Sequence, residues 1–177
     1  MLISFLIRLQ NLEPFSDLRS SAYVYPVVLA LHLSAISLFG AMIVATDLRL
    51  LGWALRDASI ADVIGRLRWP KRIGFLLAAT CGFLLFSSKA EEYYYNVFFR
   101  AKVTLLLLVV VHALVFRRSV YNKVAEFDRG GLVPGRAKLA AGLSLLLWTS
   151  IACMGRGIGY IEPPFGIHAQ LFRFLHL

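Results

Sequence analysis

Four ionisable side chains stand inside or beside long apolar stretches of this sequence: His32, Lys102, His112 and Arg156. A titratable group inside an apolar membrane segment is costly, and such groups usually mark a functional site. Imidazole is a common axial ligand of haem iron, and an amine can also bind iron when it is unprotonated, a state that apolar surroundings favour. These residue types predict a haem b site with His32 and Lys102 as the axial ligands of the iron.

The positions of these residues along their apolar segments support this pair. His32 lies ~12 Å below the outer surface if its segment enters near Val24, and Lys102 lies ~9 Å below it if its segment enters near Asn96, at ~1.5 Å per residue. Two axial ligands approach one iron, so they must lie at one depth on opposing helices. His112 lies ~24 Å below the same surface and is therefore only a secondary candidate for metal binding.

Each candidate also has an interpretation without a cofactor. Arg156, at the outer end of the last apolar segment, either pairs with the haem propionates or anchors its helix at the membrane interface. Lys102 could extend its side chain to the outer interface, and His32 or His112 could hydrogen-bond a neighbouring helix. The sequence contains no carboxylate pair, phosphate-binding loop or H-E-x-x-H pattern, so we expect no catalytic residues.

The composition places these residues in a membrane protein. The chain has 177 residues, of which 59% are hydrophobic and 16% charged, against about 25% charged in a soluble protein. A net charge of +9 would suggest nucleic-acid binding in a soluble protein, but basic membrane loops explain it and we expect no nucleic-acid partner. Cys81 and Cys153 form no C-x-x-C pair and are expected in the core.

Four apolar segments, with their flanks, are long enough to cross a bilayer. The run from Ser20 to Thr46 has 27 residues without a charge, where ~20 suffice. The run from Val103 to Phe116 has only 14, so this span must begin near Asn96 and take Lys102 into the membrane. We predict an all-α, four-transmembrane-helix bundle over residues 23–160, with spans at about 24–46, 70–88, 96–116 and 138–158.

Short amphipathic interfacial helices are expected at both termini. Residues 1–22 are predicted to form an outer-face helix and a linker, and residues 161–177 an outer-face amphipathic tail. Another surface helix is expected before the second span, where apolar residues from Ile60 to Leu67 repeat at helical spacing behind Ser59 and Pro70 closes the run.

The basic residues predict the orientation of the bundle. Twelve of the 19 Lys and Arg residues fall between spans one and two or between spans three and four. Lys and Arg concentrate in cytoplasmic loops, so both termini are predicted to lie outside.

Three segments carry a family resemblance: Leu29 to Gly52 (LALHLSAISLFGAMIVATDLRLLG), Phe99 to His112 (FRAKVTLLLLVVVH) and Gly155 to Tyr160 (GRGIGY). They resemble an uncharacterised family of bacterial four-span membrane proteins. That family is similar to the CopD-type copper-resistance proteins and to the haem-binding bacterial protoporphyrinogen oxidases, which have a His on the first span and a Lys on the third. His32 and Lys102 match those two positions. The resemblance implies the bacterial cytoplasmic (inner) membrane, with periplasmic termini.

Three functions follow from these observations. The first is a haem b-binding, cytochrome b-like membrane protein that transfers electrons between the quinone pool and an outer-face redox partner, as a subunit of a redox complex rather than a complete enzyme. The second is a non-catalytic structural or accessory subunit of a larger membrane complex. The third is a copper-handling membrane protein, although Met1, Met42 and Met154 form no cluster at one depth. The expected partners are the lipid bilayer and other proteins of a membrane complex.

Overall fold

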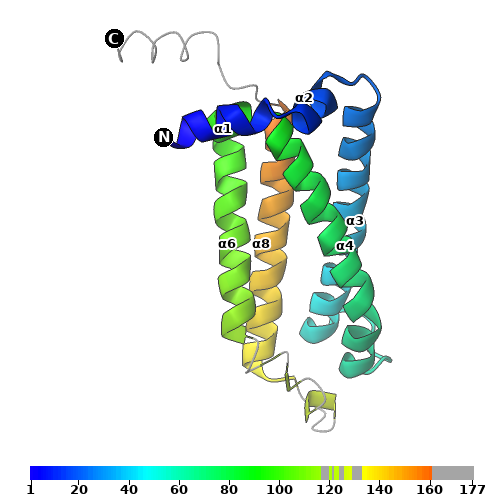
Figure 1. Ribbon diagram of the computed structural model, residues 1–177. Coiled ribbons are helices and arrows are strands. Elements are labelled where there is room, and N and C mark those ends of the chain that lie inside the picture. The colour runs from blue at the N-terminus through cyan, green and yellow to red at the C-terminus, as the bar shows by residue number, and fades with distance from the viewer. Residues whose placement is uncertain (117–119, 121, 124–125, 129–132, 161–177) are drawn as a thin grey trace.

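The computed structural model describes residues 1–116, 120, 122–123, 126–128 and 133–160. Within these residues the secondary structure is helical, without strands. Four helices are long and apolar enough to cross a membrane: α3 (Val24–Leu51), α4 (Ile60–Ser88), α6 (Val97–Phe116) and α8 (Gly135–Tyr160). They run up and down in one bundle (Figure 1). The predicted all-α, four-span architecture is confirmed.

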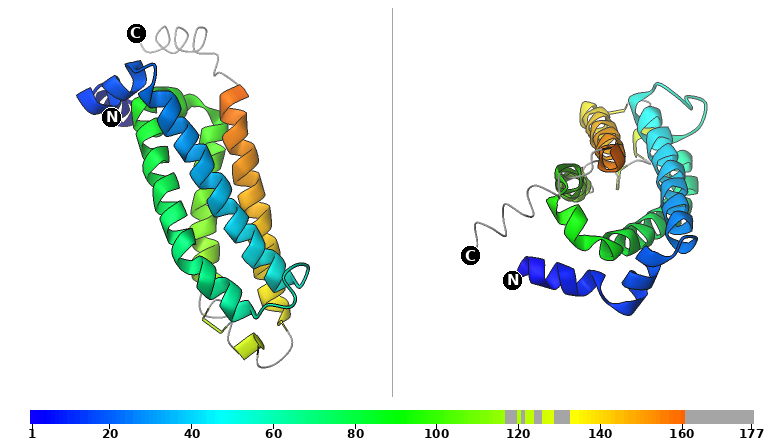
Figure 2. Two further views of the ribbon diagram at one scale, coloured as in Figure 1. Left: turned by 90° about the vertical axis from the view of Figure 1, so that its right-hand side faces the viewer. Right: turned by 90° about the horizontal axis from the view of Figure 1, so that it is seen from above.

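The four spans pack unequally on one another. Helix α3 packs along α4, α6 packs along α8, and contacts between α3 and α8 join the two pairs. Within the described chain, α4 and α6 make no comparable interface; seen along the bundle they lie apart, and the short helix α5 (Ala90–Tyr95) runs between their ends (Figure 2). The bundle is therefore well packed at three of its four helix boundaries.

Two short helices lie across one end of the bundle, here named the terminal end, which also carries α5 (Figure 1). They are α1 (Leu2–Gln10) and α2 (Glu13–Ser20), so the segment predicted as a linker contains a helix. The Gln10 side-chain amide donates to the Glu91 carboxylate at 3.3 Å and its oxygen accepts from the Glu91 N–H at 3.0 Å. Arg19 donates to the Ser88 carbonyl at 3.1 Å. These bonds fix α1 and α2 to the ends of α4 and α5.

The two longer connections meet at the opposite end, here named the loop end. The Asp128 carboxylate accepts hydrogen bonds from the backbone N–H groups of Ile60 and Ala61, both at 2.8 Å. It thereby caps the first turn of α4, whose N–H groups have no partner within the helix. A buried apolar cluster lies beside this cap: Leu50, Ile60, Val120, Phe127, Ala137, Ala140 and Ala141. The described part of the second connection is therefore packed onto the bundle.

Helix α4 differs from the sequence prediction. A surface helix ending at Pro70 was expected, with a separate span after it, but α4 is continuous from Ile60 to Ser88 and contains Pro70. Proline removes one helical hydrogen bond, and packing by neighbouring helices makes this tolerable in membrane spans. The expected helix start is confirmed, because the Ser59 hydroxyl accepts from the Asp62 N–H at 3.0 Å. With 29 residues, α4 is ~43 Å long.

The other helix boundaries lie close to those predicted. Helix α6 begins at Val97, and the Asn96 side chain accepts from the Phe99 N–H at 3.1 Å, so Lys102 lies inside the third span as predicted. Helix α3 continues past residue 46 to Leu51 and ends at Gly52, which has a φ of 74°. That left-handed conformation suits glycine. The predicted amphipathic tail, residues 161–177, lies outside the described residues.

Candidate functional site

His32 projects from α3 onto α4. A Cβ added to Gly82 would lie 2.8 Å from the His32 Cε1 atom, so the imidazole occupies the space that this glycine leaves on α4. The His32 Nδ1 atom is buried and forms no well-aligned hydrogen bond among the described residues, although the Ala78 backbone on α4 interacts with the imidazole. A buried nitrogen without a well-aligned hydrogen bond is uncommon, and a ligand, water or ion would satisfy it.

Lys102 projects from α6 onto α8. Its Nζ atom would lie 3.7 Å from a Cβ on Gly155, so the amine lies against the α8 backbone. Gly155 stands five residues before the end of α8 at Tyr160, ~7.5 Å along the helix axis. The amine therefore lies along the bundle rather than at its end. Within the described residues, Lys102 forms no ion pair.

His32 and Lys102 are close enough to interact electrostatically. His32 follows the start of α3 at Val24 by eight residues, and Lys102 follows the start of α6 at Val97 by five. The structure thus brings the two residues together in the half of the bundle next to the terminal end. Their assignment as axial haem ligands stays a prediction.

Glycines make room for the side chains of this site. Phe98 and Lys102 are four residues apart on α6 and share a face of that helix. A Cβ on Gly157 would lie 2.5 Å from Phe98 Cδ1, whereas a Cβ on Gly159 would meet no atom within 4 Å. Gly155 and Gly157 therefore allow α6 to approach α8 closely, which gives the GRGIGY segment a structural role.

Three aromatic rings from consecutive helices stack at the terminal end. The Phe86 and Phe99 ring centroids lie 5.2 Å apart, and those of Tyr93 and Phe99 lie 5.1 Å apart. Burial raises the pKa of the Tyr93 phenol above its ordinary value, and an interaction with Tyr25 adds to the rise. The stack therefore stays uncharged and joins α4, α5 and α6 near the candidate site.

His112 lies elsewhere and has its own partner. Its Nε2 atom lies 2.9 Å from the Ala140 carbonyl oxygen on α8, and its ring centroid lies 4.9 Å from that of Phe116. This hydrogen bond ties α6 to α8 in the half next to the loop end. The structure does not bring His112 to His32 and Lys102, and its contacts agree with the alternative of a helix-to-helix hydrogen bond.

Arg156 is exposed and engaged locally. Its guanidinium donates to the Tyr160 hydroxyl at 2.5 Å and lies 5.0 Å from the centre of the Tyr160 ring.

A different arginine, Arg100, lines a pocket of 360 Å³ at the terminal end. Arg100 was not among the candidates named from the sequence, although it lies inside the predicted third span and in α6. The pocket is lined by Leu2, Leu6, Phe86, Tyr94, Phe99, Arg100, Val103 and Thr104.

Asp47 is a second buried ionisable residue that the sequence reasoning missed. Its side chain is 3% exposed, and one carboxylate oxygen has no hydrogen-bond partner among the described residues. The Ser144 hydroxyl on α8 and the Lys71 amine on α4 interact with it. Asp47 follows the charge-free run that ends at Thr46, so the predicted span of 24–46 excludes it. Because α3 continues to Leu51, Asp47 lies inside the bundle instead.

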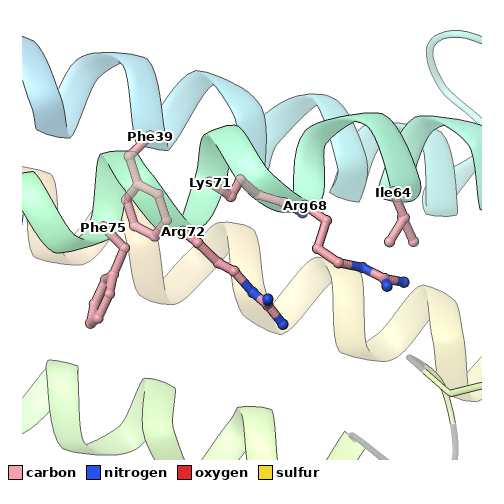
Figure 3. Close-up of a pocket in the computed structure, with 6 residues that line it drawn as sticks. All are labelled: Phe39, Ile64, Arg68, Lys71, Arg72 and Phe75. Carbon is pink, nitrogen blue, oxygen red and sulfur yellow. The ribbon is translucent and has the colours of Figure 1, made fainter.

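A second pocket, of 290 Å³, lies beside α4 in the half next to the loop end (Figure 3). Three basic side chains of α4 and three apolar side chains line it: Arg68, Lys71, Arg72, Phe39, Ile64 and Phe75. The Phe39 ring lies 5.1 Å from that of Trp148 on α8. We name this hollow the α4 basic pocket.

The described residues contain no group of three or more His, Cys, Asp or Glu side chains that could hold a metal ion. A haem needs only one or two axial protein ligands, so this finding does not bear on haem binding.

Both cysteines are free thiols. Cys81 is buried as expected, but Cys153 is exposed, so the prediction of a core position for Cys153 was wrong.

The fold and the site define an integral membrane protein whose four-helix bundle brings a histidine and a lysine together near one end. The chain belongs to a family of unknown function, DUF6644, whose model matches residues 20–161. The match includes all four spans, His32 and Lys102, and leaves α1 outside. No curated protein and no solved structure matches the sequence.

Proposed function

We propose that this protein binds one haem b in the half next to the terminal end and transfers electrons between the quinone pool and a redox partner at the outer face. The observation that carries the proposal is the buried Nδ1 of His32, which lacks a well-aligned hydrogen bond and lies within electrostatic range of the Lys102 amine. The similarity to haem-binding bacterial protoporphyrinogen oxidases, which have a His and a Lys on the same two spans, adds support by analogy.

The residues of the site fit such a group. His32 supplies an imidazole, and Lys102 supplies an amine without a carboxylate partner among the described residues. At Gly82 and Gly155 the two side chains lie against the backbone of a neighbouring helix, and this contact limits their rotamers. The aromatic rings of Phe98 and Phe99 help exclude water and so favour the uncharged amine. When bound, a haem supplies one-electron redox chemistry at a potential tuned by its axial ligands.

The absorption spectrum of the purified protein tests the proposal. We expect a b-type Soret band in the wild-type protein and loss of about 90% of it in His32→Ala, since the imidazole is the principal iron ligand. The matched control is His112→Ala, which removes a histidine outside the site and should keep the band. A wild-type protein without haem, or a His32→Ala variant with an unchanged band, would exclude the proposed site.

Lys102 variants separate its three roles. As an axial ligand, Lys102 should give a six-coordinate, low-spin spectrum that changes in Lys102→Met, whose thioether can also bind iron. As an interfacial cation it should be replaced silently by Arg. As a structural residue it should lose thermal stability in Lys102→Met, with no spectral change. We expect the first result; a spectrum unchanged from the wild type in both Lys102→Met and Lys102→Arg would reject Lys102 as a ligand.

The glycine opposite His32 offers a test that leaves both proposed ligands in place. In Gly82→Ala the new Cβ would meet the imidazole at 2.8 Å, so the ring must move. We expect the Soret band to weaken or shift. Gly65→Ala on the same helix is the matched control, because a Cβ there meets no atom within 4 Å. Equal spectra in the two variants would show that the position of the His32 ring against Gly82 does not affect haem binding.

The electron-transfer role requires the terminal end to face the redox partner. We place the protein in the bacterial cytoplasmic membrane with the termini in the periplasm, on the distribution of Lys and Arg. Tyr23→Cys at the terminal end and Asn122→Cys at the loop end test this orientation, since both native residues are exposed. Both native cysteines are first replaced by serine, because Cys153 is an exposed free thiol. An impermeant thiol reagent on intact cells should then label only Tyr23→Cys; labelling of only Asn122→Cys would invert the bundle.

A non-catalytic subunit of a larger membrane complex is the second candidate. Helix α6 has no buried residue, although it lies in the bundle. Such a surface suits a neighbouring membrane subunit as well as lipid. A wild-type protein that copurifies with stoichiometric partners and contains no haem would favour this candidate.

A further inference from the structure

Three cations crowd one stretch of α4. Arg68, Lys71 and Arg72 line the α4 basic pocket and project from one side of the helix (Figure 3). Lys71 and Arg68 are near enough to repel each other electrostatically. Within the described residues, none of the three forms an ion pair within 4 Å.

The charges around this pocket do not balance. Asp47 is the acidic group that interacts with Lys71, and it is already shared with Ser144. Arg72 lies 5.2 Å from the centre of the Trp69 ring, and this contact leaves its charge in place. The two arginines, both exposed, therefore remain without a protein counter-ion in the described structure.

The rest of the pocket is apolar. Phe39, Ile64 and Phe75 form this wall, and Phe75 is an exposed large hydrophobic residue. Arg68 stands eight residues after the start of α4 at Ile60, ~12 Å along the axis. Because α4 is ~43 Å long and a hydrocarbon core ~30 Å thick, this level is within reach of a headgroup layer for a long arginine side chain.

We infer that the α4 basic pocket binds the anionic headgroup of a phospholipid, with Arg68 and Arg72 contacting the phosphate and Phe39 and Phe75 contacting the acyl chains. Two arginines can bind phosphate oxygens through several charge-assisted hydrogen bonds. Basic pockets between membrane helices recognise anionic lipids in this way. A free phosphate would satisfy the arginines but leave the apolar wall uncovered, so the lipid fits the whole pocket. The inference does not depend on the proposed haem.

Lipid binding to the purified full-length protein tests the inference. Dioleoyl phosphatidylglycerol and dioleoyl phosphatidylcholine are titrated in detergent, and bound lipid is counted by native mass spectrometry. We expect phosphatidylglycerol to bind about tenfold more tightly. The double variant Arg68→Gln, Arg72→Gln should lower this preference to less than about twofold, because each arginine contributes about 1 kcal/mol of attraction to an anionic headgroup.

Two controls make the result specific. Arg66→Gln removes the same charge from the same helix at a residue that does not line the pocket, and should keep the preference. The double variant Arg68→Lys, Arg72→Lys keeps both charges and should bind phosphatidylglycerol within about threefold of the wild type. Equal binding of the two lipids by the wild type overturns the inference, as does an equal loss in Arg66→Gln. Displacement of phosphatidylglycerol by inorganic phosphate would assign the pocket to a free anion instead.

Discussion

The two histidines of the bundle have different surroundings in its two halves. Near the loop end, His112 lies 2.9 Å from the Ala140 carbonyl oxygen of α8, and Asp128 caps α4 in the same half. Near the terminal end, His32 and Lys102 lie against glycines, His32 Nδ1 without a well-aligned hydrogen bond and Lys102 without an ion pair among the described residues. The His112 and Asp128 contacts therefore hold helices together, whereas His32 and Lys102 are potential ligands for another molecule.

The largest effect should come from the glycine that lets α8 approach α6 near the terminal end. In Gly157→Ala the new Cβ would lie 2.5 Å from the Phe98 ring, so the ring must move or the two helices must separate. We expect a loss of about 1–3 kcal/mol, the usual cost of overpacking, measured as a lower thermal midpoint in detergent. Gly159→Ala is the control, because a Cβ there meets no atom within 4 Å. Equal midpoints would show that this helix contact is loose.

A smaller effect is expected for the cap at the loop end. Asp128→Ala removes both hydrogen bonds to the first turn of α4, and a lost cap typically costs about 0.5–2 kcal/mol. Asp128→Asn keeps one acceptor oxygen and should lose less. Hydrogen exchange of the Ile60 and Ala61 amides reports the change directly. Unchanged protection of these amides in Asp128→Ala would show that Asp128 does not stabilise the first turn of α4.

The smallest effect is expected for His112. His112→Phe keeps an aromatic ring near Phe116 but deletes the hydrogen bond to Ala140, which is worth about 1 kcal/mol. The thermal midpoint should fall slightly, and any haem spectrum should stay the same. A spectral change in this variant comparable to that in His32→Ala would mean that both histidines act at one haem site, contrary to the different roles assigned to them.

The sequence was sufficient to predict the spans and the position of Lys102 inside the third span. A 14-residue apolar run is too short to cross a bilayer alone, so its flank had to include the lysine. Local patterns were less reliable at Pro70 and Asp47. Proline is a helix breaker in the local rules, and a charge normally ends a span. Both residues nevertheless lie inside continuous helices, Pro70 exposed on α4 and Asp47 buried in α3.

The contacts that position the candidate site could not be predicted from the sequence. The pairing of Gly82 with His32 and of Gly155 with Lys102 depends on which helices are neighbours and on their axial offset. Single-sequence periodicity contains neither quantity. The same limit applies to the cap of α4 by Asp128, since Ile60 and Asp128 are 68 residues apart.

That long-range cap has a consequence for biosynthesis. Asp128 leaves the ribosome after α4 and α6, so until then the first turn of α4 has only its local cap from Ser59. The hydrogen bonds to Ile60 and Ala61 can form only when the connection before α8 has been made and folded back. A polypeptide truncated before Asp128 would therefore leave these two N–H groups of α4 without their carboxylate partner.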